Sequence, residues 1–173
     1  MLCVAGAIGS HLAFHLKRHT SHQLVLHYRR RVPPGADCIG LVPFGQTPDH
    51  VLVEGGFEVE LHDGGAPAAT QPIEAAIFTT KAQQLQAAVE HVKHRFTSQS
   101  AILLLSNGLF SVLPGVLNSL RDLNQFPTIL LGHTAHGVRR PPSLLFNHPV
   151  WVHAGMATMS YAALPSKFVS VSC

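Results

Sequence analysis

The strongest constraint on the fold is a glycine-containing turn near the start of the chain. Gly6-Ala7-Ile8-Gly9 follows a short apolar segment, 1–5, and precedes an amphipathic segment, 10–18. This order predicts a strand, a turn and a helix, because glycines permit close backbone approach and the first N–H groups of a helix can bind a dinucleotide pyrophosphate. The complete motif G-x-G-x-x-G would need a glycine in place of Val4, so a plain helix start with small residues is the alternative interpretation.

Further apolar segments alternate with segments of helical periodicity. Strands are predicted at 23–28, 75–80, 101–105 and 128–131, a helix over 82–95, and a Leu- and Val-rich segment reaches residue 123. The alternation predicts an α/β fold, with a Rossmann-like, mostly parallel sheet and helices on both faces. Gly55-Gly56 predicts an antiparallel hairpin over 49–61. Residues 143–146 and 150–153 are expected to pair as a small antiparallel appendage.

The composition is typical of one globular domain. The chain has 173 residues, of which 46% are hydrophobic, and a formal net charge of +3. Apart from Arg29-Arg30-Arg31 the basic residues are dispersed, so no nucleic acid partner is expected. Three separated cysteines form no disulfide or zinc pattern, and no apolar segment is as long as a membrane span. We therefore expect a cytoplasmic protein with no membrane partner, although the basic segment 11–18 resembles a mitochondrial presequence and leaves that location open.

Arg29 favours NADP over NAD as the cofactor. It lies about twenty residues after Gly9, where NAD enzymes place an Asp or Glu that binds the ribose 2′-hydroxyl. No acidic residue occurs between residues 21 and 36. A guanidinium group at this place can bind a 2′-phosphate with two hydrogen bonds. A solvated basic loop is the alternative interpretation.

Lys81 and Asn107 each follow a predicted strand. Ligands of open α/β sheets bind beyond the carboxyl ends of the strands, so both are candidates for contacts with the substrate or the nicotinamide. Lys81 is alternatively an ordinary solvated lysine, and Asn107-Gly108 an ordinary turn. No residue is assigned to catalysis with certainty, and the absence of G-x-S-x-G argues against a hydrolase.

The thirteen histidines do not predict a metal site. Three of them recur at four-residue spacing, which can chelate zinc, but no carboxylate or cysteine accompanies them. These three are His11, His15 and His19, and we expect them to be exposed or half-buried beside a core stripe of Ile8, Leu12 and Leu16. His133 and His136 are expected in a loop near the strand ends, where contact with a substrate is the alternative to a plain loop role.

Four segments together resemble the amino-terminal domain of the ketopantoate reductases (2-dehydropantoate 2-reductases). They are AGAIGS at 5–10, FTTKA at 78–82, LLSNGL at 104–109 and LGHTAHG at 131–137. The resemblance implies a Rossmann-type NADP-binding domain over residues 1–155 and a tail, or the start of an interdomain segment, over 156–173. It also implies NADPH-dependent reduction of 2-dehydropantoate to pantoate in pantothenate biosynthesis, with a small 2-keto acid as substrate. The full-length family implies a homodimer.

The resemblance assigns roles to individual residues. Gly6, Ala7, Ile8 and Gly9 would line the pyrophosphate, Arg29 would bind the 2′-phosphate, and Lys81 and Asn107 would contact the nicotinamide half and the mouth of the substrate site.

Two departures from the family pattern are visible. Val4 replaces the first glycine, and the family continues into an all-helical domain with its catalytic lysine, whereas this chain ends at Cys173 and Lys167 does not match that motif. We therefore expect a truncated form that is weakly active or inactive alone, because a missing general acid costs about 10²–10⁴ in rate. The alternative is a non-catalytic Rossmann module that acts through a protein or RNA partner.

Overall fold

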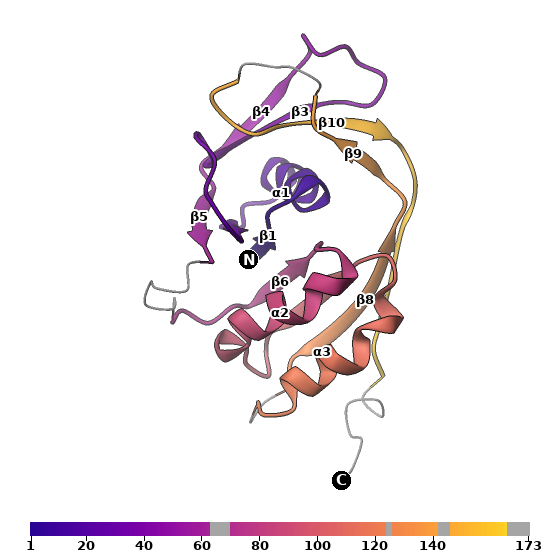
Figure 1. Cartoon of the computed structure of the whole chain (residues 1–173). Coiled ribbons are helices and arrows are strands. Elements are labelled where there is room, and N and C mark those ends of the chain that lie inside the picture. The colour runs from indigo at the N-terminus through magenta and orange to yellow at the C-terminus, as the bar shows by residue number, and fades with distance from the viewer. Residues whose placement is uncertain (63–69, 124–125, 142–145, 166–173) are drawn as a thin grey trace. The chain divides into compact units, whose positions relative to one another are not determined.

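The computed structural model describes residues 1–62, 70–123, 126–141 and 146–165 (Figure 1). The chain divides into two compact units. Unit 1 comprises Met1–Ala66 and Ala135–Thr158, and unit 2 comprises Pro67–Thr134 and Met159–Cys173. Within the described ranges, no helix has both the length and the apolar character needed to cross a membrane.

Unit 1 starts with a strand, a helix and a second strand, as the sequence predicts. β1 (Leu2–Val4), β2 (Val25–Tyr28) and β5 (Glu58–Leu61) pair in parallel in the order β1-β2-β5. All three residues of β1 are buried. Between β1 and β2 runs α1 (Ala7–His19), with Gly6 as its N-cap. The turn is therefore shorter than its sequence motif, because Ala7, Ile8 and Gly9 already belong to the helix.

A second sheet in unit 1 covers α1. β3 (Cys38–Val42), β4 (Leu52–Gly55), β9 (Gly137–Arg139) and β10 (Val150–Gly155) form it in the order β4-β3-β10-β9. β3 and β10 pair in parallel, while the β3–β4 and β9–β10 pairs are antiparallel. α1 packs against all four strands, and Figure 1 shows the helix beneath them. The helix is thus enclosed by strands on more than one side.

The predicted hairpin over 49–61 is wrong. Both of its strands exist as β4 and β5, but β4 pairs with β3 and β5 pairs with β2. The physical reason is the connection between them: Gly56 has a φ of 74°, which turns the chain out of the second sheet. Phe57 then becomes buried, and the Glu58 amide donates a hydrogen bond to the Leu24 carbonyl, which joins β5 to β2.

Unit 2 repeats the strand-helix alternation. β6 (Ala75–Phe78), β7 (Ala101–Leu105) and β8 (Thr128–Thr134) pair in parallel, and β11 (Met159–Ala163) adds antiparallel to β8. The connections contain α2 (Ala82–Val92), the short 3₁₀ turns η1 (Lys93–Arg95) and η2 (Leu109–Ser111), and α3 (Leu113–Leu120). α2 and α3 pack side by side in Figure 1. Apolar side chains from both helices and from the strands form the buried core of this unit: Phe78, Leu85, Val89, Ile102, Leu104 and Leu120.

The mostly parallel, Rossmann-like sheet is confirmed. Two details differ from expectation. β11 lies within the segment 156–173, where the sequence shows little periodicity, because an antiparallel edge strand needs only one covered face. Of the expected appendage, β10 is present but pairs with β9 and β3, and residues 143–145 lie outside the described residues.

Candidate functional site

The first turn of α1 presents backbone donors to open space. The Ser10 amide donates to the Gly6 carbonyl over 2.8 Å, which closes the first helical turn. Helix geometry leaves the earlier N–H groups without intrahelical acceptors. No side chain caps them and no acidic residue lies in the first turn. A Cβ built on Gly6 would have no heavy atom of the described residues within 4 Å, so a ligand can approach the backbone closely here.

Val4 fits its position without strain. It is a buried strand residue in register with His27, and none of the described non-glycine residues has a positive φ. The β-branched side chain is therefore compatible with β1. A glycine is needed where φ is positive, and Val4 does not have a positive φ in this chain.

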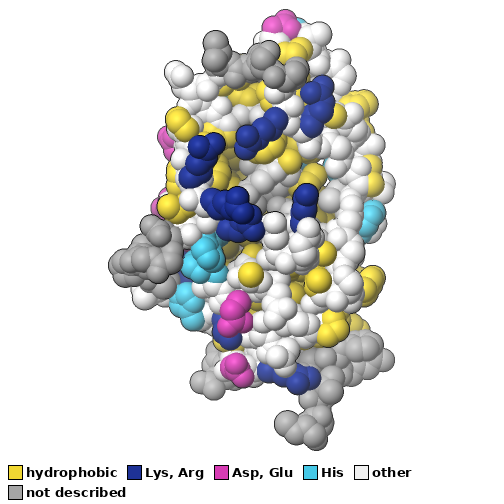
Figure 2. Space-filling view, in the orientation of Figure 1, with side chains coloured by type: hydrophobic (Ala, Val, Ile, Leu, Met, Phe, Trp, Pro, Cys, Tyr) yellow, Lys and Arg dark blue, Asp and Glu magenta, His cyan; other side chains and the backbone are white. Residues whose placement is uncertain are grey.

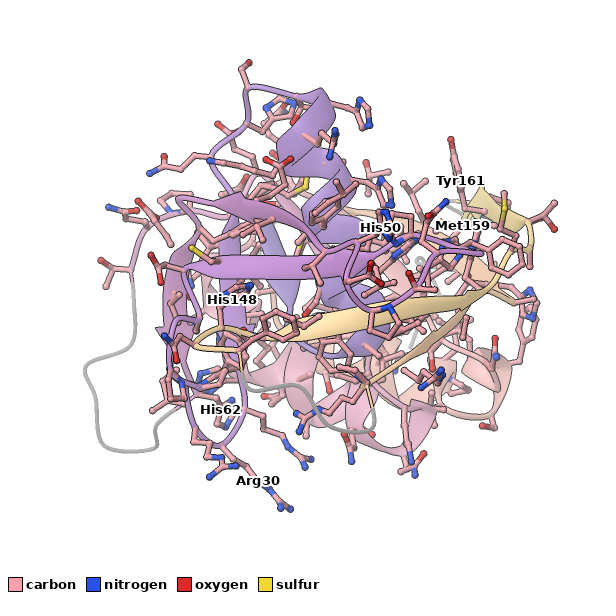
Figure 3. The ribbon with its side chains drawn as sticks, turned by 90° about the horizontal axis from the view of Figure 1, so that it is seen from above. Arg30, His50, His62, His148, Met159 and Tyr161 are labelled. Carbon is pink, nitrogen blue, oxygen red and sulfur yellow. The ribbon has the colours of Figure 1, made fainter. Side chains whose placement is uncertain are left out.

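Arg29 follows the strand next to the glycine turn. β1 and β2 end side by side at the pair Val4↔His27, and Gly6 and Arg29 each follow two residues after this pair. Arg29, Arg30 and Arg31 are all exposed, and Arg30 points away from the ribbon in Figure 3. Lys and Arg side chains also stand out from the surface drawn in Figure 2. The carboxyl ends of β1 and β2 thus combine free amide hydrogens with a guanidinium group.

Lys81 and Asn107 occupy equivalent places in unit 2. β6 and β7 end side by side at the pair Phe78↔Leu104, and Lys81 and Asn107 each follow three residues after this pair. Both residues are exposed. Gly108 has a φ of 77°, and a Cβ built on it would lie 3.7 Å from Cβ of Ala82, so this turn lies close to the start of α2. Thr80 Oγ1 is buried beside Lys81 and has no hydrogen-bond partner among the described residues.

A pocket of about 260 Å³ lies at the end of β2. Tyr28, the last residue of β2, lines it together with Trp151 and Arg140. The Arg140 guanidinium lies 5.4 Å from the Trp151 ring centroid, a cation–π contact. Trp151 Nε1 is buried and has no hydrogen-bond partner in the described part of the chain. The pocket therefore offers an aromatic surface and a cation.

The expected position of the α1 histidines is wrong for His11. It is buried together with Ser10, Ala13 and Phe14, whereas Ile8, Leu12 and Leu16 are only half-buried. The reason is the second sheet, which covers the helix face that carries His11. His133 is also misplaced by the sequence, since it is an exposed residue of β8 and not of a loop.

Residues distant in the sequence surround His11. His136 precedes β9 and His153 lies in β10, and potential ligand atoms of the three rings lie within 4.8 Å of one another. Burial, and then the positive charges that His15, His153 and His136 can carry, lower the pKa of His11 to about 4. Burial and the proximity of His136 also lower the pKa of His153. Sequence reasoning missed this group because only His11 belongs to the spacing pattern on α1.

Comparisons with known proteins were made for the sequence and for the structure. A family model described as "Ketopantoate reductase PanE/ApbA" matches residues 5–165. A comparison with curated protein sequences gives no significant match.

The solved structures that resemble the chain share its fold. A probable 2-dehydropantoate 2-reductase from Bacillus subtilis matches with a TM-score of 0.65 and 18% identity, over 94% of this chain and 48% of that chain. A PanE/ApbA family ketopantoate reductase from Ralstonia eutropha JMP134 gives 0.63 and 18%, over 92% and 47%. A dimeric ketopantoate reductase from Staphylococcus aureus gives 0.61 and 15%, over 96% and 48%. This chain spans about half the length of these structures.

Proposed function

Because the chain belongs to the ketopantoate reductase family, we propose that it binds NADP(H) at the first turn of α1 and takes part in hydride transfer from NADPH to a small 2-keto acid. The observation that carries the proposal is the register of β1 and β2, which brings the Gly6 turn and Arg29 to neighbouring strand ends. A pyrophosphate on the α1 amides and a 2′-phosphate on Arg29 use these two ends.

The residues present fit the phosphates of a dinucleotide. The space that a Cβ on Gly6 would occupy is open, and the first turn of α1 carries no acidic side chain that would repel an anion. The pyrophosphate accepts hydrogen bonds from the backbone amides of Gly6, Ala7, Ile8 and Gly9. The positive end of the helix dipole stabilises its negative charge. The pyrophosphate is thus bound by backbone groups.

Arg29 supplies the preference for NADP over NAD. No carboxylate lies between residues 21 and 36 to accept a hydrogen bond from an unphosphorylated ribose. A guanidinium group binds a phosphate with parallel, charge-assisted hydrogen bonds. The pocket beside Tyr28 suits the adenosine half, since its Trp151 surface is aromatic and Arg140 adds a second cation.

Lys81 and Asn107 contact the nicotinamide half and the keto acid in this proposal. Their support is that both follow the neighbouring ends of β6 and β7, and that Gly108 lies close to Ala82 at the start of α2. The Lys81 ammonium is suited to the carboxylate or keto oxygen of an anionic substrate such as 2-dehydropantoate. NADPH supplies the hydride when bound, and reduction of 2-dehydropantoate gives pantoate.

A titration of the protein with NADPH and NADH tests the cofactor. Trp151 is the only tryptophan, so quenching of its fluorescence reports nucleotide binding beside β2. Wild type should prefer NADPH, and Arg29→Ala should weaken NADPH binding roughly 10–100-fold without changing NADH binding, the worth of a charge-assisted hydrogen bond or two. Arg31→Ala, which removes another exposed arginine of the same cluster, is the matched control and should keep the preference.

Two outcomes would count against the proposal. If neither nucleotide binds saturably, the chain is a Rossmann-fold binding module without a dinucleotide. If both bind equally and Arg29→Ala changes nothing, the 2′-phosphate assignment is wrong. Turnover of 2-dehydropantoate with NADPH tests the second half of the proposal, and nucleotide binding without turnover of any 2-keto acid would limit the function to cofactor binding.

A further inference from the structure

Three imidazole rings from separate parts of unit 1 meet on one side of α1. His11 comes from the second turn of the helix, His136 immediately precedes β9, and His153 lies in β10. The ring centroids of His11 and His153 are 4.5 Å apart, those of His136 and His153 are 5.2 Å apart, and those of His11 and His136 are 5.8 Å apart. We call these three residues the histidine cluster.

The backbone of β9 and β10 is shaped to hold two of these rings together. Gly137 and Gly155 face one another, and a Cβ on Gly137 would lie only 3.2 Å from the Gly155 amide nitrogen. The strand register also shifts between His153 and Gly155. With two glycines and this irregularity, the strands approach closely enough for His136 Nδ1 to lie 3.1 Å from His153 Nε2. The pair is therefore fixed by the fold.

His11 completes the group from the helix. Its Nδ1 atom is buried and has no hydrogen-bond partner within the described ranges. Buried polar atoms of native proteins normally have a partner, and an orphaned one requires an explanation such as an ion. A cation bound at the cluster would give this buried nitrogen of His11 a partner.

We propose that the histidine cluster binds one divalent cation of the zinc class. One ligand atom from each ring lies within 4.8 Å of the others, a separation that small side-chain rotations reduce to that of ligands on one ion. Neutral imidazole suits zinc, cobalt, nickel and copper, whereas magnesium and calcium select oxygen ligands. Three protein ligands leave a fourth position for water, the arrangement that zinc uses outside closed structural sites.

A pocket beside the cluster is lined by one of its three residues, His153. It has a volume of about 140 Å³, and His153 lines it together with Phe14 and His15. Arg18 also lines the pocket, but its guanidinium group lies 3.7 Å from a Glu54 carboxylate oxygen, and this ion pair offsets its charge. No thiolate or carboxylate belongs to this cluster among the described residues, so the site depends on the histidines alone.

The test is a titration of chelator-treated protein with Zn²⁺ by calorimetry and with Co²⁺ by visible absorption. Wild type should bind one equivalent, and Co²⁺ should give the intense bands of a four-coordinate ion. His136→Ala and His153→Ala should each weaken binding at least about 100-fold, since loss of even an outer-shell partner costs 10–100-fold. His22→Ala removes an exposed histidine that lies outside the cluster and should bind like wild type.

Thermal unfolding separates loss of the site from loss of the fold. Without metal, His136→Ala, His153→Ala and His22→Ala should all unfold cooperatively, and one equivalent of Zn²⁺ should raise the melting temperature of wild type and of His22→Ala only. If a variant fails to fold, the stoichiometry and the Co²⁺ spectrum of wild type decide the question. Absence of one-to-one binding by wild type, or wild-type affinity in folded His136→Ala and His153→Ala, would overturn the proposal. Neither outcome bears on nucleotide binding.

Discussion

The first and second turns of α1 present two different kinds of binding group. The first turn offers amide hydrogens and a position without a side chain at Gly6, and these groups lie within four consecutive residues. The second turn offers the ring of His11, which becomes part of a potential site only when His136 and His153 are brought against it. One helix thus carries both the proposed backbone site and the proposed side-chain site.

This difference determines how each region responds to change. A backbone site tolerates many side chains, provided that the helix starts at the same residue and the space before it stays open. A side-chain site needs particular residues, and it also needs the elements that carry them to keep their spacing to within a fraction of an ångström. The histidine cluster therefore depends on the packing of α1 against the second sheet, whereas the first turn depends on β1 and the helix start.

The largest expected effect comes from a residue on which both regions depend. Phe14 is 1% exposed in α1, and Phe14→Ala leaves a cavity beneath the helix. The change should lower the free energy of unfolding by about 3–5 kcal/mol, the range for buried phenylalanines. Denaturant unfolding followed by circular dichroism measures it. Nucleotide and Zn²⁺ binding should weaken together, because both use α1.

The matched control for this variant is Phe110→Ala. Phe110 is 80% exposed, so its loss should change the free energy of unfolding by no more than about 0.5 kcal/mol. If Phe14→Ala abolished Zn²⁺ binding and left nucleotide binding intact, the two turns of α1 would be less coupled than their shared helix indicates.

The next largest effect separates the two regions. In Gly6→Asp the carboxylate would occupy the open space before α1 and repel a pyrophosphate. We expect nucleotide affinity to fall about 100-fold or more, the loss of two charge-assisted hydrogen bonds. The same carboxylate can cap the helix and interact with its dipole, so thermal stability should stay equal or rise slightly. Zn²⁺ binding should not change.

Gly6→Asp should lower the nucleotide affinity while it leaves the thermal stability equal or raises it slightly. Gly6 has a φ of 179°, an extended conformation that aspartate adopts freely, so backbone strain is not a competing cause. Gln46→Asp places the same charge on an exposed residue of unit 1 and is the control. Undiminished NADPH binding by Gly6→Asp would show that the first turn of α1 is not the pyrophosphate site.

The same contrast explains how far the sequence could predict the molecule. The glycine turn, the strand ends at Arg29, Lys81 and Asn107, and the mostly parallel sheet follow from local patterns, since each depends on a few neighbouring residues. The pairing of β4 with β3 does not follow from local patterns. Gly55-Gly56 predicts a hairpin, whereas the chain passes from one sheet to the other at this point. The histidine cluster is the extreme case: residues more than a hundred positions apart meet through β9 and β10, and neither strand has a distinctive sequence pattern.

The smallest expected effect concerns the strand that anchors the glycine turn. Cys3 in β1 is fully buried, and burial raises the pKa of its thiol to about 12. Burial and the nearby Asp37 also raise the pKa of Cys38, but this side chain is only half-buried, so iodoacetamide at pH 8.5 should modify Cys38 well before the fully buried Cys3. Native stability should be unaffected below pH 9 and should fall as the pH rises above it, since the unfolded thiol ionises first. Mass spectrometry of a Cys173→Ser variant measures the rates at which iodoacetamide modifies Cys38 and Cys3. Equal rates would show that β1, the strand that precedes the first turn of α1, is accessible to solvent.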